Sequence, residues 1–83
     1  MEKIVLHIYI PNLQEWVEAA VPLLLTVGEV TALLGSLLEE VTENRYLSSG
    51  KEFLCTFQPE RVLKREKTLR EYGLLNGDRV LFM

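Results

Sequence analysis

Cysteine, histidine and tryptophan each occur once in this sequence of 83 residues, as Cys55, His7 and Trp16. A single cysteine cannot form an intramolecular disulfide, which fits a reducing compartment. One histidine and one cysteine do not supply the several ligands that a metal site needs, so we expect no metal and no cofactor. No sequence pattern places a nucleophile or an acid beside His7 either. We therefore expect His7 to be a solvated strand residue, and we expect no catalytic residue and no enzyme activity.

Long apolar runs and an excess of positive charge are also missing. The longest apolar stretch, residues 19–25, contains Pro22 and is far shorter than the ~20 residues that span a bilayer. The first residues lack the basic start, apolar run and cleavage site of a signal peptide. Nine Lys and Arg against twelve Asp and Glu give a net charge of -3. That balance argues against nucleic acid as the main partner. A cytoplasmic protein that binds no nucleic acid is expected.

Apolar residues make up 48% of the sequence and charged residues 25%, which is the composition of a folded chain. A chain of this length can bury one core but not two. We therefore expect residues 1–83 to form a single domain.

The most regular segment is residues 26–42, where apolar side chains recur with the i, i+3, i+4, i+7 spacing of a helix. Thr26 and Glu29 have the spacing of a capping box, which predicts that the helix starts there. The expected core face consists of Val27, Val30, Leu33, Leu34, Leu37, Leu38 and Val41. The expected wet face consists of Glu29, Thr31, Ser36, Glu39, Glu40 and Glu43. Gly35 suggests the close approach of a strand.

Alternation of apolar residues predicts strands on both sides of this helix. Residues 4–10, with the isoleucines inward, and residues 15–21 should form a hairpin around Pro11-Asn12. Further strands are expected at residues 52–57, 62–63 and 79–83. The order is β-β-α-β-β-β. The predicted fold is α+β, a mixed sheet of four to five strands with one helix across one face, and the last strand lies parallel beside the first.

The third strand can be aligned in two ways. We place Phe53, Cys55 and Phe57 on one face and Leu54 and Thr56 on the other. A slip of one residue would bury Leu54 and expose Phe53 and Cys55 instead. In the first alignment Cys55 is a small buried residue, since no cationic neighbourhood that would activate its thiol is recognisable.

An apolar patch is expected on the sheet face opposite the helix. An exposed patch of this kind on a small protein marks an interaction site, and Trp and Tyr are enriched at binding hot spots. The candidate partner-binding residues are Tyr9, Trp16, Leu54, Leu81 and Met83. The alternative is that Tyr9 and Trp16 form a cross-strand pair that only covers the sheet.

A local basic cluster stands out in this acidic protein. It consists of Lys64, Arg65, Lys67 and Arg70. A solvated loop is the simpler interpretation. Contact with an acidic partner or an anionic membrane surface is the alternative.

Residues 62–80 resemble the C-terminal half of a ubiquitin-like β-grasp domain. The resemblance rests on Val62-Leu63, a charged loop, Thr68-Leu69, Tyr72-Gly73 and Asn76-Gly77-Asp78 before the final strand. Within that fold the chain is most similar to the small YukD/EsaB-type proteins, the ubiquitin-like components of type VII (WXG-substrate, ESAT-6-like) secretion systems in Gram-positive bacteria. Val21-Pro22 leading into Val27-Gly28-Glu29-Val30 supports this similarity.

The resemblance implies a non-catalytic cytoplasmic accessory that acts near a membrane-anchored FtsK/SpoIIIE-like ATPase and its membrane partners. Two alternatives remain open: a structural β-grasp subunit that self-associates, for example as a homodimer, and a sulfur carrier or protein modifier. Carriers and modifiers in this fold need a flexible tail that ends in Gly-Gly. Here Leu81-Phe82-Met83 lies inside the predicted last strand, so we expect neither conjugation nor thiocarboxylate chemistry.

Overall fold

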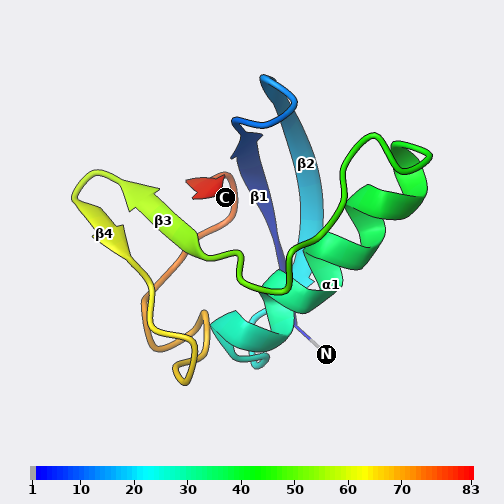
Figure 1. Ribbon diagram of the computed structural model, residues 1–83. Helices are drawn as coiled ribbons and strands as arrows, with labels where there is room; N and C mark the ends of the chain where they lie inside the picture. Colours follow the sequence, from blue (N-terminus) through cyan, green and yellow to red (C-terminus); the bar gives the residue numbers. More distant parts are fainter. Residues whose placement is uncertain (1) are drawn as a thin grey trace.

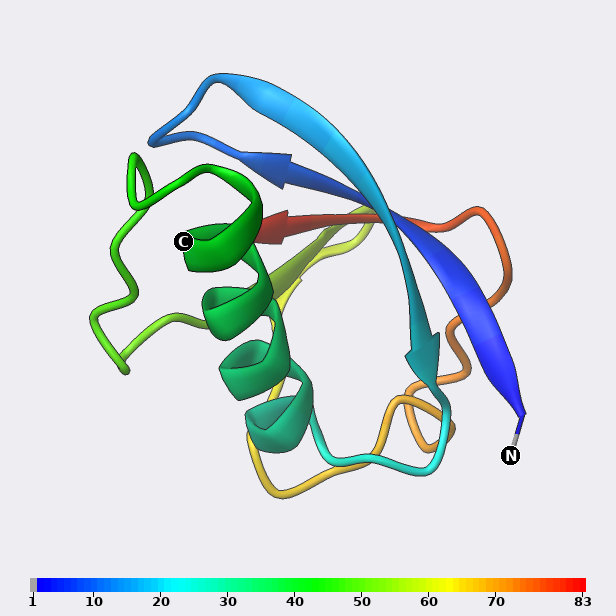
Figure 2. The ribbon, with the colours of Figure 1, turned by 90° about the vertical axis from the view of Figure 1, so that its right-hand side faces the viewer.

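The computed structural model describes residues 2–83, which form one mixed sheet and one helix. The elements are β1 (Lys3–Ile10), β2 (Glu15–Pro22), α1 (Val27–Val41), β3 (Leu54–Phe57), β4 (Glu60–Val62) and β5 (Arg79–Phe82). The five strands have the order β2-β1-β5-β3-β4, and α1 lies across one face of the sheet (Figures 1 and 2). β5 is parallel to β1, and the other neighbours are antiparallel. The predicted α+β architecture and the central last strand are confirmed.

Helix α1 begins where the sequence predicts. The backbone N–H of Glu29 donates to Thr26 Oγ1 at 3.1 Å, and the N–H of Thr26 donates to Glu29 Oε1 at 2.9 Å. This capping box satisfies two backbone donors that the first turn of a helix leaves without a partner. Its position also fixes which residues can face the sheet.

The core lies between α1 and the sheet. The isoleucine face of β1 points into it, as predicted, and Leu6, Ile8 and Ile10 are 0% exposed. Opposite these strands, α1 contributes Val27, Val30, Leu34 and Leu38. Segments without regular structure close the core with Tyr46, Leu63, Leu69 and Leu74.

The prediction of which α1 side chains face the core was partly wrong. Leu33, Leu37 and Val41 are 53%, 46% and 63% exposed. Thr31, which was predicted to face water, is buried. The reason is that α1 packs against a loop as well as against the sheet, so that its buried face is rotated away from the flank that carries Leu33 and Leu37.

The contacts of two small residues show this rotation. A Cβ added at Gly35 would lie 2.6 Å from Ser48 Oγ. Thr31 donates its hydroxyl to the Gly28 carbonyl at 2.9 Å and receives a 3.5 Å hydrogen bond from Arg65. Gly35 therefore marks the close approach of a loop and not of a strand.

The prediction of which face of the third strand is buried was also wrong. Leu54 lies opposite Phe82, and Thr56 lies opposite Val80. Phe82 and Val80 belong to the core, so Leu54 is 0% exposed and is not part of the surface patch. Phe57 lies on the other face and is 46% exposed. The strand begins at Leu54 because Glu52, its predicted start, is held in the preceding loop.

Candidate protein-interaction surface

The sheet face opposite α1 carries a row of apolar side chains that crosses all five strands. The register places Trp16 opposite Tyr9, Tyr9 opposite Leu81, Leu81 opposite Cys55 and Cys55 opposite Val62. Directly opposed residues share a face, so these five side chains follow one line across the sheet.

Aromatic contacts hold one end of this row. The ring centroids of Tyr9 and Trp16 are 5.0 Å apart, and those of Trp16 and Phe57 are 5.9 Å apart. The indole of Trp16 is thus placed between two other rings while the residue stays 51% exposed. Tilted ring pairs at these separations are favourable, so the cluster is ordered before any partner arrives.

The row continues at the end of the sheet. Met83 and Phe53 exchange two backbone hydrogen bonds, at 2.8 and 3.2 Å. Met83 is 48% exposed and Val62 is 57% exposed. We define the open-face patch as Tyr9, Trp16, Phe57, Val62, Leu81 and Met83.

The open-face patch contains four of the five candidate residues, namely Tyr9, Trp16, Leu81 and Met83. Leu54 is excluded because it belongs to the core. Sequence reasoning missed Phe57 and Val62 as members of the patch. The signal that could have found Phe57 is the alternation of β3, since burying Leu54 turns Phe57 outward.

A charged row borders the open-face patch. The register places Glu18, His7 and Arg79 side by side on the same sheet face. Beyond them Phe57 is paired with Glu60. His7 is half-buried between these neighbours. An apolar centre with a charged border is the usual composition of a protein-protein contact surface.

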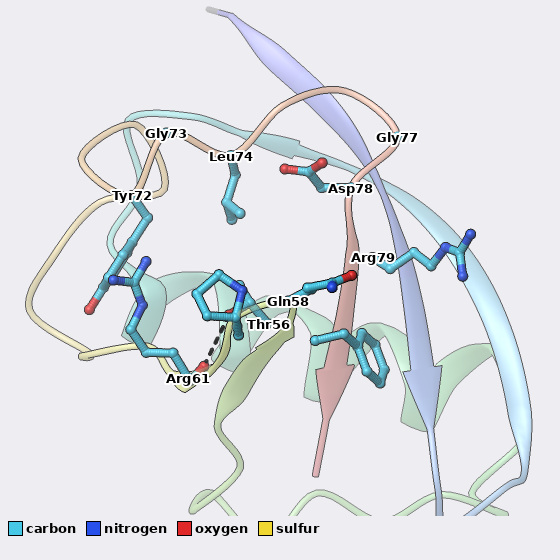
Figure 3. Close-up of a pocket in the computed structure, with 11 residues that line it drawn as sticks. Thr56, Gln58, Arg61, Tyr72, Gly73, Leu74, Gly77, Asp78 and Arg79 are labelled. Atoms are coloured by element: carbon cyan, nitrogen blue, oxygen red, sulfur yellow. Dashed lines mark hydrogen bonds between the residues drawn. The ribbon is translucent and has the colours of Figure 1, made fainter.

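Next to Phe57, the sheet surface is hollowed between the β3–β4 hairpin and residues 72–79. The hollow has a volume of about 450 Å³ and is lined by polar groups that include Gln58, Asp78 and Arg79 (Figure 3). Tyr72 stands at its wall, with the Arg61 guanidinium 5.0 Å from the ring centroid. The lining also includes the apolar residues Phe57, Pro59 and Leu74, and Thr56, whose hydroxyl donates to the Pro59 carbonyl at 2.6 Å.

The predicted basic cluster is exposed, and three of its members contact the protein itself. Arg65 donates to the Glu52 carbonyl at 3.2 Å, and Lys67 Nζ lies 5.6 Å from the Tyr72 ring centroid. Arg70 forms an ion pair with Glu2. Part of the basic cluster is therefore engaged in contacts that hold residues 63–72 in place.

Cys55 is buried, as predicted, although it lies on the open face. Its neighbours Leu81 and Val62 cover the small side chain from both sides. Burial raises the pKa of the thiol, and the nearby Glu60 carboxylate raises it further. A thiol with a raised pKa is a poor nucleophile, so Cys55 acts here as a small apolar residue.

Within residues 2–83, no group of three or more His, Cys, Asp or Glu side chains could hold a metal ion. The same residues include no helix long and apolar enough to cross a membrane.

No protein-family model and no curated protein matches the sequence. Solved structures, in contrast, match almost the whole chain. Ubiquitin from Caldiarchaeum subterraneum superposes with a TM-score of 0.74 at 21% identity, over 98% of this chain and 91% of that one. This is a ubiquitin-like β-grasp fold.

Two other structures with this β-grasp fold are ubiquitin-like domains of EccD proteins, and one of them, EccD1, is described as a type VII secretion system protein. The ubiquitin-like domain of EccD1 from Mycobacterium tuberculosis has a TM-score of 0.67 at 14% identity and matches 100% of this chain and 99% of that one. The EccD5 ubiquitin-like domain from Mycobacterium xenopi has a TM-score of 0.72 at 14% identity, over 100% and 94%. At these identities the likeness shows the fold alone.

Proposed function

We propose that this ubiquitin-like protein is a non-catalytic accessory of a Gram-positive type VII secretion system and works by binding another protein through its open-face patch. The observation that carries the proposal is the apolar row across all five strands, with Trp16 half exposed at its end. A contiguous apolar patch that is exposed on a small domain marks a contact surface.

The open-face patch is built for binding at a low entropic cost. Association normally loses free energy because flexible side chains must be ordered. Trp16 is already held between Tyr9 and Phe57, and Leu81 is half-buried in the sheet. A partner that covers Trp16 gains the burial of a large ring without ordering it first.

The proposed partner is the membrane-anchored FtsK/SpoIIIE-like secretion ATPase or the membrane components associated with it. The similarity to YukD/EsaB-type proteins, which rests on Val21-Pro22 leading into residues 27–30, supports this assignment, and so does the fold shared with the EccD domains. In this proposal the protein is cytoplasmic, lies at the inner face of the membrane through its partner, and binds neither nucleic acid nor a cofactor.

A second function is favoured by one feature of the same surface. The central part of the apolar row, Tyr9, Leu81 and Cys55, carries no charge, so two copies could meet there without repulsion. The protein would then be a self-associating structural β-grasp subunit, or an adaptor unrelated to secretion.

Affinity capture from the native bacterium separates these functions. The baits are the wild type, Trp16→Ala and Met83→Ala, with Leu75→Ala as the matched control because Leu75 is a 68% exposed leucine outside the patch. We expect the wild type and the control to recover the ATPase or its membrane partners. Trp16→Ala should reduce the recovery by about tenfold, as loss of a hot-spot residue does.

Thermal unfolding first checks that all four baits are folded. If Trp16→Ala and the wild type recover equal amounts of the secretion components, the open-face patch is not the binding site. If no secretion component is recovered and light scattering shows a stable dimer that Trp16→Ala disrupts, the self-associating subunit is the correct function.

A further inference from the structure

The basic cluster is fixed at one end of the molecule. The N–H of Val27 donates to the Lys67 carbonyl at 2.8 Å, and the N–H of Gly28 donates to the Arg65 carbonyl at 3.0 Å. These bonds attach the cluster to the first turn of α1. Figure 2 shows the start of α1 and the yellow and orange segment after β4 together at the lower end of the molecule. We call residues 23–28 and 64–70 the basic end.

The basic end has the opposite charge to the rest of the protein. Residues 64–70 contain four of the nine Lys and Arg and one of the twelve Asp and Glu. The net charge of this segment is therefore +3, and the net charge of the remaining chain is -6. All four basic residues are exposed. The contacts of Arg65 with a carbonyl and of Lys67 with an aromatic ring orient these cations without neutralising them.

The carboxylates nearest to the basic end are largely engaged elsewhere. Glu29 is held in the cap of α1, and Glu71 accepts from the Thr68 N–H at 2.9 Å. Glu2 pairs with Arg70, and the other three cations of the basic end form no ion pair within residues 2–83. Their charge is therefore available to an anion from outside the protein.

An exposed leucine lies beside these cations. The N–H of Arg70 donates to the Leu23 carbonyl at 3.1 Å, and the N–H of Leu69 donates to the Leu25 carbonyl at 3.3 Å. Leu24, between these two acceptors, is 55% exposed, whereas Leu23 is buried and Leu25 is half-buried. Apolar side chains next to exposed cations are typical of surfaces that bind anionic membranes.

The free acidic side chains lie far from the basic end. β2 runs from Glu15 to Pro22, so Glu15 is about 23 Å from the basic end along the strand. On α1, Glu40 is about 21 Å from Thr26, and Glu43 follows beyond the end of the helix. The Debye length at physiological ionic strength is about 8 Å. An anionic surface at the basic end would therefore attract the cations, while its repulsion of these glutamates would be screened.

We propose that the basic end docks on an anionic lipid surface. Lys64, Arg65 and Lys67 face the lipid phosphates, and Leu24 enters the boundary between headgroups and acyl chains. An acidic protein segment would meet the cations but would leave Leu24 without an apolar partner. The basic end is separate from the open-face patch, and this inference does not rest on the secretion assignment.

The test is sedimentation of the full-length protein with vesicles at physiological salt. One set of vesicles is phosphatidylcholine alone, and the other contains about one third phosphatidylglycerol. We expect binding only to the second set, and we expect it to weaken as salt is added. Lys64→Glu should weaken binding by about 25-fold, because each cation near an anionic surface contributes about fivefold and the variant also adds a repulsive charge. The matched control Arg45→Glu changes the same charge at an exposed residue beyond the far end of α1, and should bind as wild type does.

A second pair of variants tests the apolar contact. Leu24→Ala should weaken vesicle binding by about tenfold, since its side chain no longer enters the acyl boundary. Leu47→Ala is the control, because Leu47 is 70% exposed in the loop after α1. Thermal unfolding checks that all variants are folded.

Trp16, the single tryptophan, reports the orientation of the protein on the vesicle. It lies about 20 Å from Pro22 along β2, so its fluorescence should stay unchanged when the basic end binds lipid. A blue shift would show that the open-face patch enters the membrane instead, and the proposal would be wrong.

Three other results would overturn the proposal. The first is an absence of binding to phosphatidylglycerol vesicles at every lipid concentration reached. The second is an equal loss of binding in Lys64→Glu and Arg45→Glu, because the attraction would then not be located at the basic end. The third is binding of a polyglutamate peptide without binding of vesicles, because the occupant would then be an acidic protein segment.

Discussion

Glu52 is a buried carboxylate whose hydrogen bonds hold the loop before β3. Its Oε2 accepts from the Tyr46 hydroxyl at 2.7 Å and from the Ser49 N–H at 3.0 Å. Its Oε1 accepts from Ser48 Oγ at 3.0 Å and from the Gly50 N–H at 3.1 Å. Burial alone would raise the pKa of Glu52, but these hydrogen bonds outweigh it and hold the pKa below its ordinary value.

We predict that Glu52→Gln flattens the pH dependence of stability. A carboxylate whose pKa is lower in the folded than in the unfolded chain stabilises the fold above its unfolded pKa of about 4.3. That contribution is lost as the pH falls through the folded pKa. Urea unfolding between about pH 6 and about pH 3 should therefore show a steeper loss of unfolding free energy in the wild type than in Glu52→Gln.

The control is Glu40→Gln, since Glu40 is exposed and its side chain makes no hydrogen bond within residues 2–83. It should follow the wild-type curve. At neutral pH Glu52→Gln should cost about 1–3 kcal/mol, the usual cost of disturbing a buried hydrogen-bonded group. Parallel pH curves for Glu52→Gln and wild type would show that this carboxylate does not carry the effect.

The role of Glu52 could not be predicted from the sequence. The alternation of residues 52–57 extends the strand pattern back to Glu52, and nothing local shows that Tyr46 and Ser48 will reach it. Thr26 and Glu29 are the opposite case. Their capping box was predicted because all of its partners lie within three residues of one another.

At the scale of elements, the two faces of β3 have different roles. Residues on its buried face stabilise the core, and Phe57 on its other face belongs to the open-face patch. The alternation shows two faces but not which one is buried, because that depends on pairing with β5. The same holds for α1. Its apolar period predicts the helix, but packing against Ser48 and Arg65 decides which flank is left exposed.

This register gives a prediction for β3. Leu54→Ala should lower the free energy of unfolding by about 2–5 kcal/mol, because it leaves a cavity in the core. Phe57→Ala should cost about 1 kcal/mol or less, since the ring is half exposed and loses mainly its contact with Trp16. Denaturant unfolding of both variants measures the difference. A larger cost for Phe57→Ala than for Leu54→Ala would mean that β3 is aligned the other way.

At the scale of the molecule, the order of elements and the central last strand were predictable from hairpin and turn signals. The distribution of charge was not recognised. β2 and α1 contain no Lys or Arg, so all nine basic residues lie in the other segments of the fold. A pattern in one dimension does not show which elements become neighbours.

The sheet order predicts where the structure opens last. β5 joins β1 to β3, and without it no strand pairing connects the β1–β2 half to the β3–β4 half. In native-state hydrogen exchange, we expect the slowest amides in β1 and β5, with protection equal to the global unfolding free energy. Amides of β4, an outer strand of three residues, should exchange faster. Slower exchange in β4 than in β5 would contradict this order of stability.

The central place of β5 also has a consequence for synthesis on the ribosome. Residues 79–82 are translated after every other element, yet they pair with both halves of the sheet. A nascent chain that has emerged only as far as β4 can form the β1–β2 hairpin and α1, but it cannot complete the core. Folding of this protein therefore waits until β5 has left the exit tunnel. Until then, the apolar faces of β1 and β3 are open to chaperones and to aggregation.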